Sequence, residues 1–197
     1  MTENADLTPV PRTCEDDLDT AKLSLYLDAI REKYGPVFLE EKDLLEKLGI
    51  ISSFGGKETT TLAGLLIFGK NPQLYLPQLH FTVLAGSGDN VTVDKIYGTL
   101  SEMKDRTMET IKKRMGKRGK VGYLSGKHVE MPAYPLEAIE EAVWNSLIHR
   151  DYDPYASGKY IRIKMTEKYI EIKSPGPILG ERKQDFHIET YAYCRNT

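Results

Sequence analysis

Along most of the chain, the apolar residues recur at helical spacing. Leu23 and Leu27 follow Asp19 on one helical stripe, and Gly35-Pro36 interrupts the pattern, so we expect a helix between these two boundaries. The same reasoning predicts three further helices, over residues 40–48, 99–115 and 135–149. The short apolar run at residues 62–68 is interpreted as a buried helix, with a buried strand as the alternative.

Strands are expected where apolar and polar residues alternate, or where β-branched residues gather between turns. Two such segments, residues 79–84 and 91–96, are separated by a glycine-rich turn, and a second pair, residues 160–165 and 168–173, forms a hairpin. Residues 121–129 fit either a short strand or a loop. Because helices are mixed with hairpin-like strands, the sequence predicts an α+β fold.

We expect the chain to be organised in three parts. Residues 1–18 are polar and acidic and contain two prolines, which is typical of a tail or linker. Residues 19–130 form an α+β region, and residues 131–197 form a second region with the last long helix and the alternating hairpin. No helix or strand pattern closes the sequence after Ser174-Pro175-Gly176-Pro177, so we expect the chain to be an incomplete piece of a larger protein.

Composition narrows the classes of function. Lys and Arg number 27 against 29 Asp and Glu, a formal net charge of −2, so any contact with nucleic acid has to come from a local patch. The two cysteines lie at opposite ends of the chain and indicate a reducing compartment, and the four histidines lack the spacing of a zinc site. No apolar run is long enough for a bilayer and no signal peptide opens the chain. We therefore expect a cytoplasmic protein with no membrane partner.

The helix expected at residues 135–149 carries the most informative pattern. At 100° per residue, one stripe is apolar and should face the core; its residues are Leu136, Ile139, Val143 and Leu147. The opposite stripe places a carboxylate, an amide and an imidazole at Glu141, Asn145 and His149, interleaved with apolar side chains, which indicates a partly covered face. Such groups can hold a cation, orient a water or meet a phosphate. The alternative is a face whose polar groups make only caps and local hydrogen bonds.

A dense basic cluster lies at the end of the helix expected at residues 99–115. Six of its nine residues are cationic: Lys112, Lys113, Arg114, Lys117, Arg118 and Lys120. The cluster is a candidate for binding a phosphate backbone. No aromatic residue interleaves it, and cations are favoured at a helix C-terminus in any case, so a solvated helix end is the alternative.

Two smaller patterns have simple interpretations. Arg162, Lys164, Glu171 and Lys173 are expected on the outer face of the last hairpin, where they pair across the two strands. Gly55-Gly56-Lys57 has glycines and a lysine as a phosphate-binding loop does. It lacks the preceding strand and the full glycine spacing, so we expect an ordinary loop.

Four segments of the chain, in the same order and spacing, resemble the divergent AAA family. They are TLAGLLIFGKNPQLYLP at 61–77, DKIYGTLSEM at 94–103, YPLEAIEEAVWNSLIHRDY at 134–152 and IEIKSPGPI at 170–178. The resemblance covers about residues 19–196. Members of this family are described as transcriptional regulators or as helicase-related, with a Schlafen-type AlbA domain before this region and often a winged helix after it. The resemblance implies a regulator that contacts DNA through domains outside this chain.

The second half of that region is similar to the GHKL, or histidine-kinase-type, ATPases. In those proteins a helix supplies a glutamate that orients the attacking water and, four residues on, an asparagine that binds Mg²⁺ between the phosphates. The similarity assigns these roles to Glu141 and Asn145, with His149 one turn further on the phosphate side. It also implies ATP and Mg²⁺ as cofactors, and makes residues 131–197 a truncated GHKL-like α/β sandwich.

The chain departs from the GHKL pattern in two places. The adenine-reading aspartate corresponds to Ser174, which offers a hydroxyl and no carboxylate, and a single glycine, Gly176, follows it. The glycine-rich lid has no counterpart before Arg195-Asn196-Thr197, so its backbone donors to phosphate are missing. We therefore expect Ser174 and Gly176 on the ATP side, no tight binding of ATP or Mg²⁺, and little or no ATP hydrolysis by this chain.

Two further functions remain open. One is a non-catalytic interaction or dimerisation module, in which the polar stripe is structural and the chain forms a homodimer. The other is a nucleic-acid binder that works through the cluster from Lys112 to Lys120.

Overall fold

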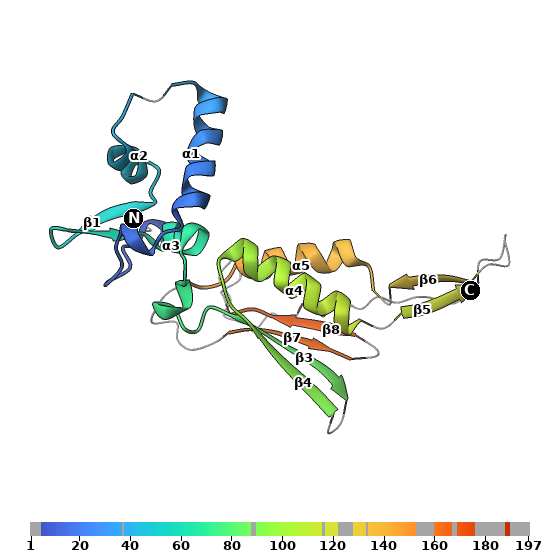
Figure 1. The fold of residues 1–197 in the computed structure, drawn as a ribbon. Coiled ribbons are helices and arrows are strands. Elements are labelled where there is room, and N and C mark those ends of the chain that lie inside the picture. The colour runs from blue at the N-terminus through green and yellow to red at the C-terminus, as the bar shows by residue number, and fades with distance from the viewer. Residues whose placement is uncertain are drawn as a thin grey trace, which may run out of the picture. The chain divides into compact units, whose positions relative to one another are not determined.

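The computed structural model describes residues 5–36, 38–87, 90–115, 117–121, 128–132, 134–152, 160–166, 169–175 and 188–189; at 5, 87, 117–121, 128–132 and 188–189 it describes the backbone alone. The fold is α+β, as the sequence predicts (Figure 1). The chain divides into two compact units, Met1–Leu79 with Gly98–Glu102, and His80–Tyr97 with Met103–Thr197. This division differs from the boundary expected near residue 130.

The first unit contains three α-helices and one short hairpin. Its elements are η1 (Ala5–Leu7), η2 (Glu15–Asp17), α1 (Thr20–Tyr34), α2 (Glu41–Lys47), β1 (Ile51–Phe54), β2 (Lys57–Thr60), α3 (Leu62–Phe68) and η3 (Pro72–Leu74). The expected helices at α1 and α2 are confirmed, and the apolar run at α3 is a helix and not a strand. Helix α1 begins where predicted because the Asp19 carboxylate accepts hydrogen bonds from the backbone N–H groups of Ala21 and Lys22.

Residues 5–18, expected as a tail or linker, belong to the first unit. Pro9 forms an antiparallel bridge with Thr61, and Leu18 forms another with Gly69. Leu18 is fully buried and is part of the core of this unit, which also contains Leu23, Leu27, Leu44, Leu45, Ile50, Ile51 and Phe68. The local polarity of the segment gives no sign of these contacts, because both partners lie far along the chain.

The segment Gly55-Gly56, expected as a loop, is the turn of the β1–β2 hairpin. Both glycines adopt left-handed backbone angles, with φ of 59° and 75°. A two-residue turn of this kind matches the twist of the flanking strands and needs residues that tolerate positive φ. The strands themselves were missed because they are short and rich in Ser, Thr, Glu and Lys.

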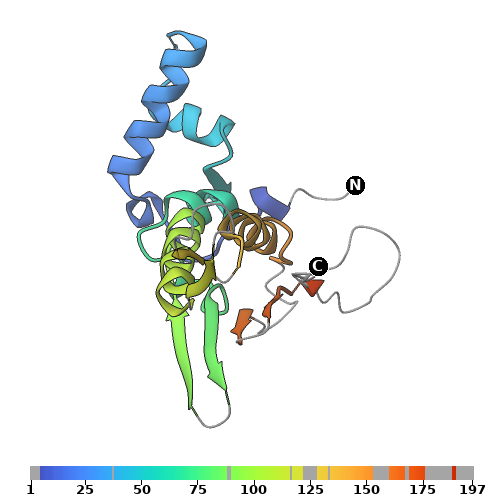
Figure 2. The same cartoon turned by 90° about the vertical axis from the view of Figure 1, so that its right-hand side faces the viewer.

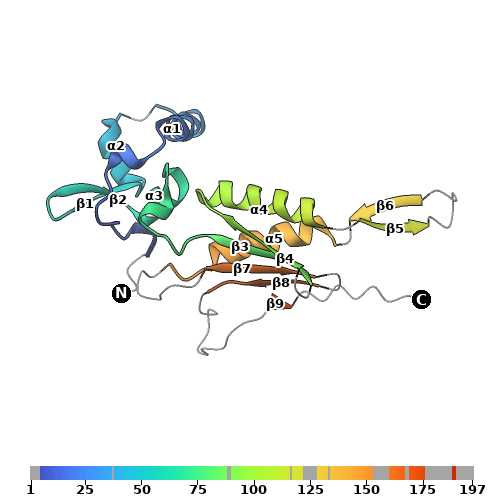
Figure 3. The same ribbon diagram turned by 60° about the horizontal axis from the view of Figure 1, so that its bottom comes forward.

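The second unit is a five-stranded sheet with helices on one face (Figures 1 and 3). The strands are β3 (Phe81–Ser87), β4 (Asn90–Ile96), β7 (Ile161–Met165), β8 (Ile170–Lys173) and β9 (Ile188–Glu189); the helices are α4 (Leu100–Arg114) and α5 (Leu136–Ile148). Their order is β4-β3-β7-β8-β9, in which β3 and β7 are parallel and the other neighbours antiparallel. Figure 2 shows how the β3–β4 ribbon extends past the helices.

A separate hairpin of β5 (Lys117–Val121) and β6 (His128–Pro132) occupies part of the segment for which a short strand or a loop was expected. The helices predicted at residues 99–115 and 135–149 are α4 and α5, and the four strands predicted around them are β3, β4, β7 and β8. None of the helices in the described part of the chain is long and apolar enough to cross a membrane.

The core of the second unit lies between the sheet and its two helices. Strand β7 alternates strictly, with Ile161, Ile163 and Met165 buried and the residues between them exposed. Phe81 and Val83 are fully buried on β3, beside these positions in the register. Each such side chain contributes roughly 1.5–3 kcal/mol when it is removed from water. This burial fixes which face of the sheet meets the helices.

Candidate functional site

Helix α5 packs on the sheet with the stripe that the sequence predicts. Val143 and Leu147 are fully buried and Ile139 is nearly so, while Leu136 is half-buried at the first turn. Lys104 of α4 binds the Glu140 carboxylate at 2.9 Å and lies 5.7 Å from the centre of the Trp144 ring. These contacts fix the rotation of α5 about its axis.

The rotation of α5 turns the predicted site residues away from the sheet. Glu141 and His149 are exposed, and Asn145 is half-buried. His149 is the C-cap of the helix, and its backbone N–H donates to the Asn145 carbonyl. The face was expected to be partly covered; this holds around Asn145, whereas neighbouring Ile148 is 60% exposed. The three side chains therefore share one side of the helix, and two of them are directly accessible to a ligand.

The segment after β8 is joined to the C-terminal end of α5. The Ser174 hydroxyl donates to the Ser146 carbonyl at 2.7 Å, and the Asp151 backbone N–H donates to the Pro175 carbonyl at 2.8 Å. Ser174 was expected to face the adenine. Its hydroxyl proton is donated to the helix, so only its oxygen lone pairs can accept a hydrogen bond from a ligand. Gly176, expected on the ATP side, lies outside the described residues.

Arg150 and Tyr152 were not chosen from the sequence as site residues. Both follow the C-terminal end of α5, close to the residues just described. The Arg150 side chain is buried and its guanidinium lies 5.6 Å from the centre of the Tyr152 ring. Burial lowers the pKa of this guanidinium. Nearby Tyr152 and Asp151 oppose the effect without cancelling it, so the pKa of Arg150 lies below its ordinary value. The Tyr152 hydroxyl donates to the Leu147 carbonyl at 2.6 Å and so satisfies the last turn of α5.

The donors on α5 fit magnesium better than they fit a soft metal. Glu141 and Asn145 supply a carboxylate and an amide oxygen, the ligand types that Mg²⁺ takes when phosphates and waters complete its shell. Within the described residues, no group of three or more His, Cys, Asp or Glu side chains could hold a metal without such help. Any ion at this place would therefore have to arrive with a phosphate ligand.

The basic cluster is divided between two elements. Lys112, Lys113 and Arg114 form the last turn of α4, where the helix dipole favours cations, and Arg114 forms an ion pair with Asp94 at 3.1 Å. Lys117, Arg118 and Lys120 follow on β5, where only the backbone is described. The first three cations therefore lie at the end of the helix, as expected, and the other three lie on the strand that follows it.

A small cavity of about 90 Å³ lies in the first unit beneath α1. It is lined by the buried side of the helix and by Glu15, Arg31 and Glu41. Pockets that hold a nucleotide-sized ligand are several times larger. This cavity is therefore no candidate for the nucleotide site.

Comparison with known proteins supports the fold and leaves the activity open. The model of a domain of unknown function (DUF8451) matches residues 1–82, which include the whole first segment of the first unit, Met1–Leu79. The crystal structure of the DIP2311 protein from Corynebacterium diphtheriae is similar to this chain with a TM-score of 0.54 at 20% sequence identity. The likeness covers 89% of this chain and 34% of that one, so this chain spans about a third of its length. No curated protein matches the chain.

Proposed function

We propose that this chain supplies one wall of a GHKL-type nucleotide site within a larger transcriptional regulator of the divergent AAA type. The observation that supports this most directly is the rotation of α5: its apolar stripe is buried on the sheet, and Glu141, Asn145 and His149 share the opposite side. A helix that lies on a sheet and presents a carboxylate and an amide one turn apart is the arrangement that the resemblance implies. DNA contact is assigned to domains outside this chain.

The roles of the residues follow from their chemistry. The Glu141 carboxylate is exposed and can accept a proton or a hydrogen bond from a water next to a bound phosphate. The Asn145 side chain is half-buried, and its amide oxygen would help to hold a magnesium ion, which would neutralise the charge of the phosphates. His149 at the C-cap is exposed, and its imidazole would offer a hydrogen-bond donor to a phosphate oxygen on the same side of the helix. Ser174 holds the β8 end against the helix and offers an acceptor to the adenine amino group.

The experiment is a calorimetric titration of the 197-residue chain with a non-hydrolysable ATP analogue, in the presence and in the absence of Mg²⁺. Binding in the wild type should depend on Mg²⁺ and should weaken at least tenfold in Asn145→Ala, because the ion loses a direct ligand. Glu137→Ala, an exposed carboxylate two turns earlier on the helix, is the matched control and should leave binding unchanged.

Absence of binding in both the wild type and Asn145→Ala, when the titration is repeated with a protein extended at its C-terminus, would reject the proposal. Binding that Glu137→Ala weakens as much as Asn145→Ala would also reject it, since the effect would then be one of general charge or helix stability. A homodimer seen by light scattering in the absence of nucleotide, together with no binding, would favour the interaction module in its place.

A further inference from the structure

The face of the sheet that lies away from α4 and α5 has a composition of its own. Because Phe81 and Val83 on β3 and Ile161 and Ile163 on β7 are buried under the helices, the residues between them point to the other side. Among the described residues of this unit, no helix lies on that side (Figures 1 and 3). We call it the outer face; its described residues are His80, Thr82, Leu84, Val91, Val93, Lys95, Tyr97, Tyr160, Arg162, Lys164, Tyr169, Glu171 and Lys173.

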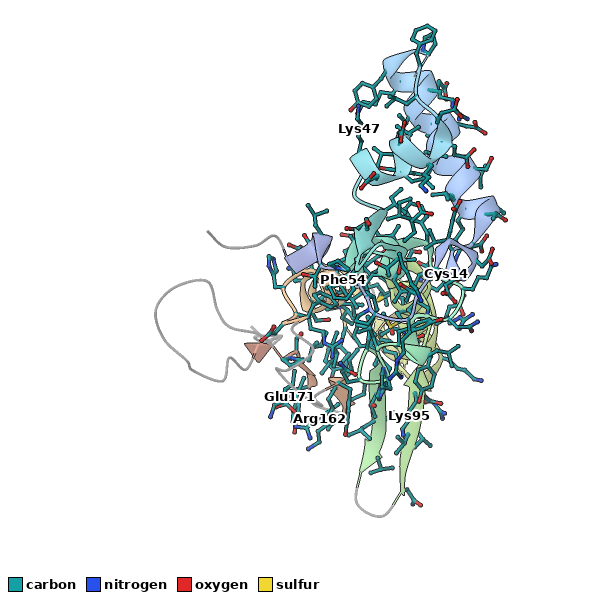
Figure 4. All side chains as sticks on the ribbon, turned by 90° about the vertical axis from the view of Figure 1, so that its left-hand side faces the viewer. Cys14, Lys47, Phe54, Lys95, Arg162 and Glu171 are labelled. Atoms are coloured by element: carbon teal, nitrogen blue, oxygen red, sulfur yellow. The ribbon has the colours of Figure 1, made fainter. Side chains whose placement is uncertain are left out.

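The strand register arranges the outer face in rows. Thr82 pairs with Lys95 on one side and Arg162 on the other, and Arg162 pairs with Lys173. One row across the sheet therefore contains three cations and a threonine. The next row contains Val93, Leu84, Lys164 and Glu171. Figure 4 shows Lys95, Arg162 and Glu171 on three strands of the sheet.

The charges of the outer face are unbalanced. Its described residues include four Lys and Arg side chains and one carboxylate, Glu171, which binds Lys173 at 2.9 Å. Arg162 and Lys173 are directly opposite each other, and like charges in that relation destabilise a sheet. Within the described residues, the exposed side chains of Lys95 and Arg162 have no acidic partner. A cost of this kind is compensated when an anion binds across the row.

Aromatic side chains adjoin the cations. The His80 ring stacks on Tyr160, with centres 5.0 Å apart and planes 20° apart, and lies 5.2 Å from Tyr97 on the other side. Tyr97 and Tyr160 are 43% and 42% exposed, so each presents part of its ring to solvent. At the other end of β7, Lys164 lies 5.8 Å from the centre of the Tyr169 ring. The basic row is thus flanked by aromatic rings on the same face.

We propose that the outer face binds single-stranded nucleic acid. Flat, open sheet faces recognise single strands by stacking unpaired bases on aromatic side chains while nearby cations hold the phosphates. The bases of a duplex are already stacked on one another and cannot reach Tyr97 and Tyr160.

The overall charge of the chain means that any binding of nucleic acid must depend on a local group of cations. The net charge is −2, so attraction of the whole molecule to a polyanion does not explain binding. An anionic membrane would be attracted by the cations but gives no role to the stacked rings. The outer face is on the opposite side of the sheet from Glu141 and Asn145, so this proposal does not depend on nucleotide binding at α5.

The test is a titration of the full chain against a labelled oligothymidine of about 15 nucleotides, near the upper end of what one such surface covers. Oligouridine and duplex DNA of the same length serve as comparisons, without ATP or Mg²⁺. Three or four phosphate contacts predict that the logarithm of the binding constant falls with that of the salt concentration with a slope of about −2 to −3. The single strands should bind at least tenfold more tightly than the duplex.

Two sets of variants locate the site. Removing both charges in K95Q/R162Q should reduce the magnitude of the slope by about 1.4 and the affinity at low salt about tenfold. K33Q/K47Q removes two exposed lysines of the first unit and should change neither, as should K112Q/K113Q at the end of α4. Tyr160→Leu should weaken binding about 5- to 100-fold, whereas Tyr160→Phe keeps the ring and the affinity. Circular dichroism establishes that each variant is folded.

Several results would overturn the proposal. They are failure of the wild type to bind either single strand at low salt, equal or tighter binding of duplex, and equal effects of K95Q/R162Q and K33Q/K47Q. Loss confined to K112Q/K113Q would place the site at the α4 end instead. Competition by phosphatidylserine vesicles with the same dependence on Lys95, Arg162 and Tyr160 would identify a membrane surface.

Discussion

Lys22 and Glu102 form an ion pair at 2.7 Å, although 80 residues separate them in the sequence. The Glu102 carboxylate also accepts a hydrogen bond from the Thr99 backbone N–H at 2.9 Å, and so caps the first turn of α4. Burial raises the pKa of Glu102, but the bonds from Lys22 and Thr99 outweigh it and hold the pKa below the ordinary value of 4.5. One side chain therefore joins α1 to the start of α4 and stabilises that start.

The double role of Glu102 predicts a graded response to mutation. Glu102→Gln removes the ion pair but keeps an acceptor for Thr99, and should cost about 0.5–1 kcal/mol, because both side chains are about one-third exposed. Glu102→Ala also loses the cap and should cost about 1 kcal/mol more. Urea denaturation of both variants measures the difference. Equal costs for the two variants would show that the cap contributes nothing.

The pH dependence of the same pair follows from the lowered pKa of Glu102. A carboxyl group whose pKa is lower in the folded state stabilises the protein above its unfolded pKa, and this contribution is lost as the pH falls through the folded value. The stability difference between wild type and Glu102→Gln should therefore be constant above about pH 5 and shrink below pH 4.5. Glu46→Gln, which replaces an exposed carboxylate of α2, is the control measured in parallel.

The two sides of α5 predict opposite outcomes for neighbouring residues. Leu147 is fully buried, so Leu147→Ala should destabilise the second unit by about 2–5 kcal/mol through lost burial and a residual cavity. Ile148 is 60% exposed, and Ile148→Ala should change the free energy of unfolding by no more than about 0.5 kcal/mol. The comparison uses thermal or urea unfolding. Similar costs at both positions would mean that α5 is rotated differently and that Glu141 does not face outward.

Helix ends and apolar stripes could be predicted because their causes are local. Asp19 accepts from the first N–H groups of α1, and Gly35, with φ of 84°, ends the helix, so both signals lie within a few residues of their effect. The bridge between Pro9 and Thr61 and the parallel pairing of β3 with β7 join distant segments. No local pattern specifies such pairs, and the segment at residues 5–18 was misjudged for that reason.

Part of the candidate site could also be predicted from the sequence. The periodicity of α5 gave its buried stripe correctly, because 3.6 residues per turn fixes which positions share a side. Periodicity gives no information about what covers the other side, and so the exposure of Glu141 was not foreseen. The outer face was recognised only at Arg162, Lys164, Glu171 and Lys173, with pairing as its role. The register shows that Lys164 does face Glu171, whereas Arg162 faces another cation.

The hydroxyl of Thr61 makes hydrogen bonds in the first unit, and the effect of their loss on mutation can be predicted. Its Oγ1 accepts from the Gly64 backbone N–H at 2.9 Å, which caps α3, and donates to the Gly49 carbonyl at 2.6 Å. Thr61→Ala should therefore cost about 2 kcal/mol, since the cap is lost and buried backbone groups are left without this partner. Thr61→Ser retains the hydroxyl and should cost less than half as much. An unchanged stability in Thr61→Ala would show that these bonds are not formed in solution.

Arg162 and Lys164 lie two residues apart on β7, and both are exposed on the outer face, but their partners on β8 have opposite charges. Replacement of Arg162 by Thr removes repulsion from Lys173 and introduces a residue that favours strands, so Arg162→Thr should stabilise the protein by about 0.2–1 kcal/mol. Replacement of Lys164 by Thr removes attraction to Glu171, so Lys164→Thr should be neutral or destabilising by a similar amount. Urea denaturation at low salt measures both, and the difference should shrink at high salt, where exposed charges are screened. A variant that gains stability while it loses affinity for single strands would show that Arg162 is retained for binding at the expense of the fold. Loss of stability in Arg162→Thr would mean that this side chain serves the sheet itself.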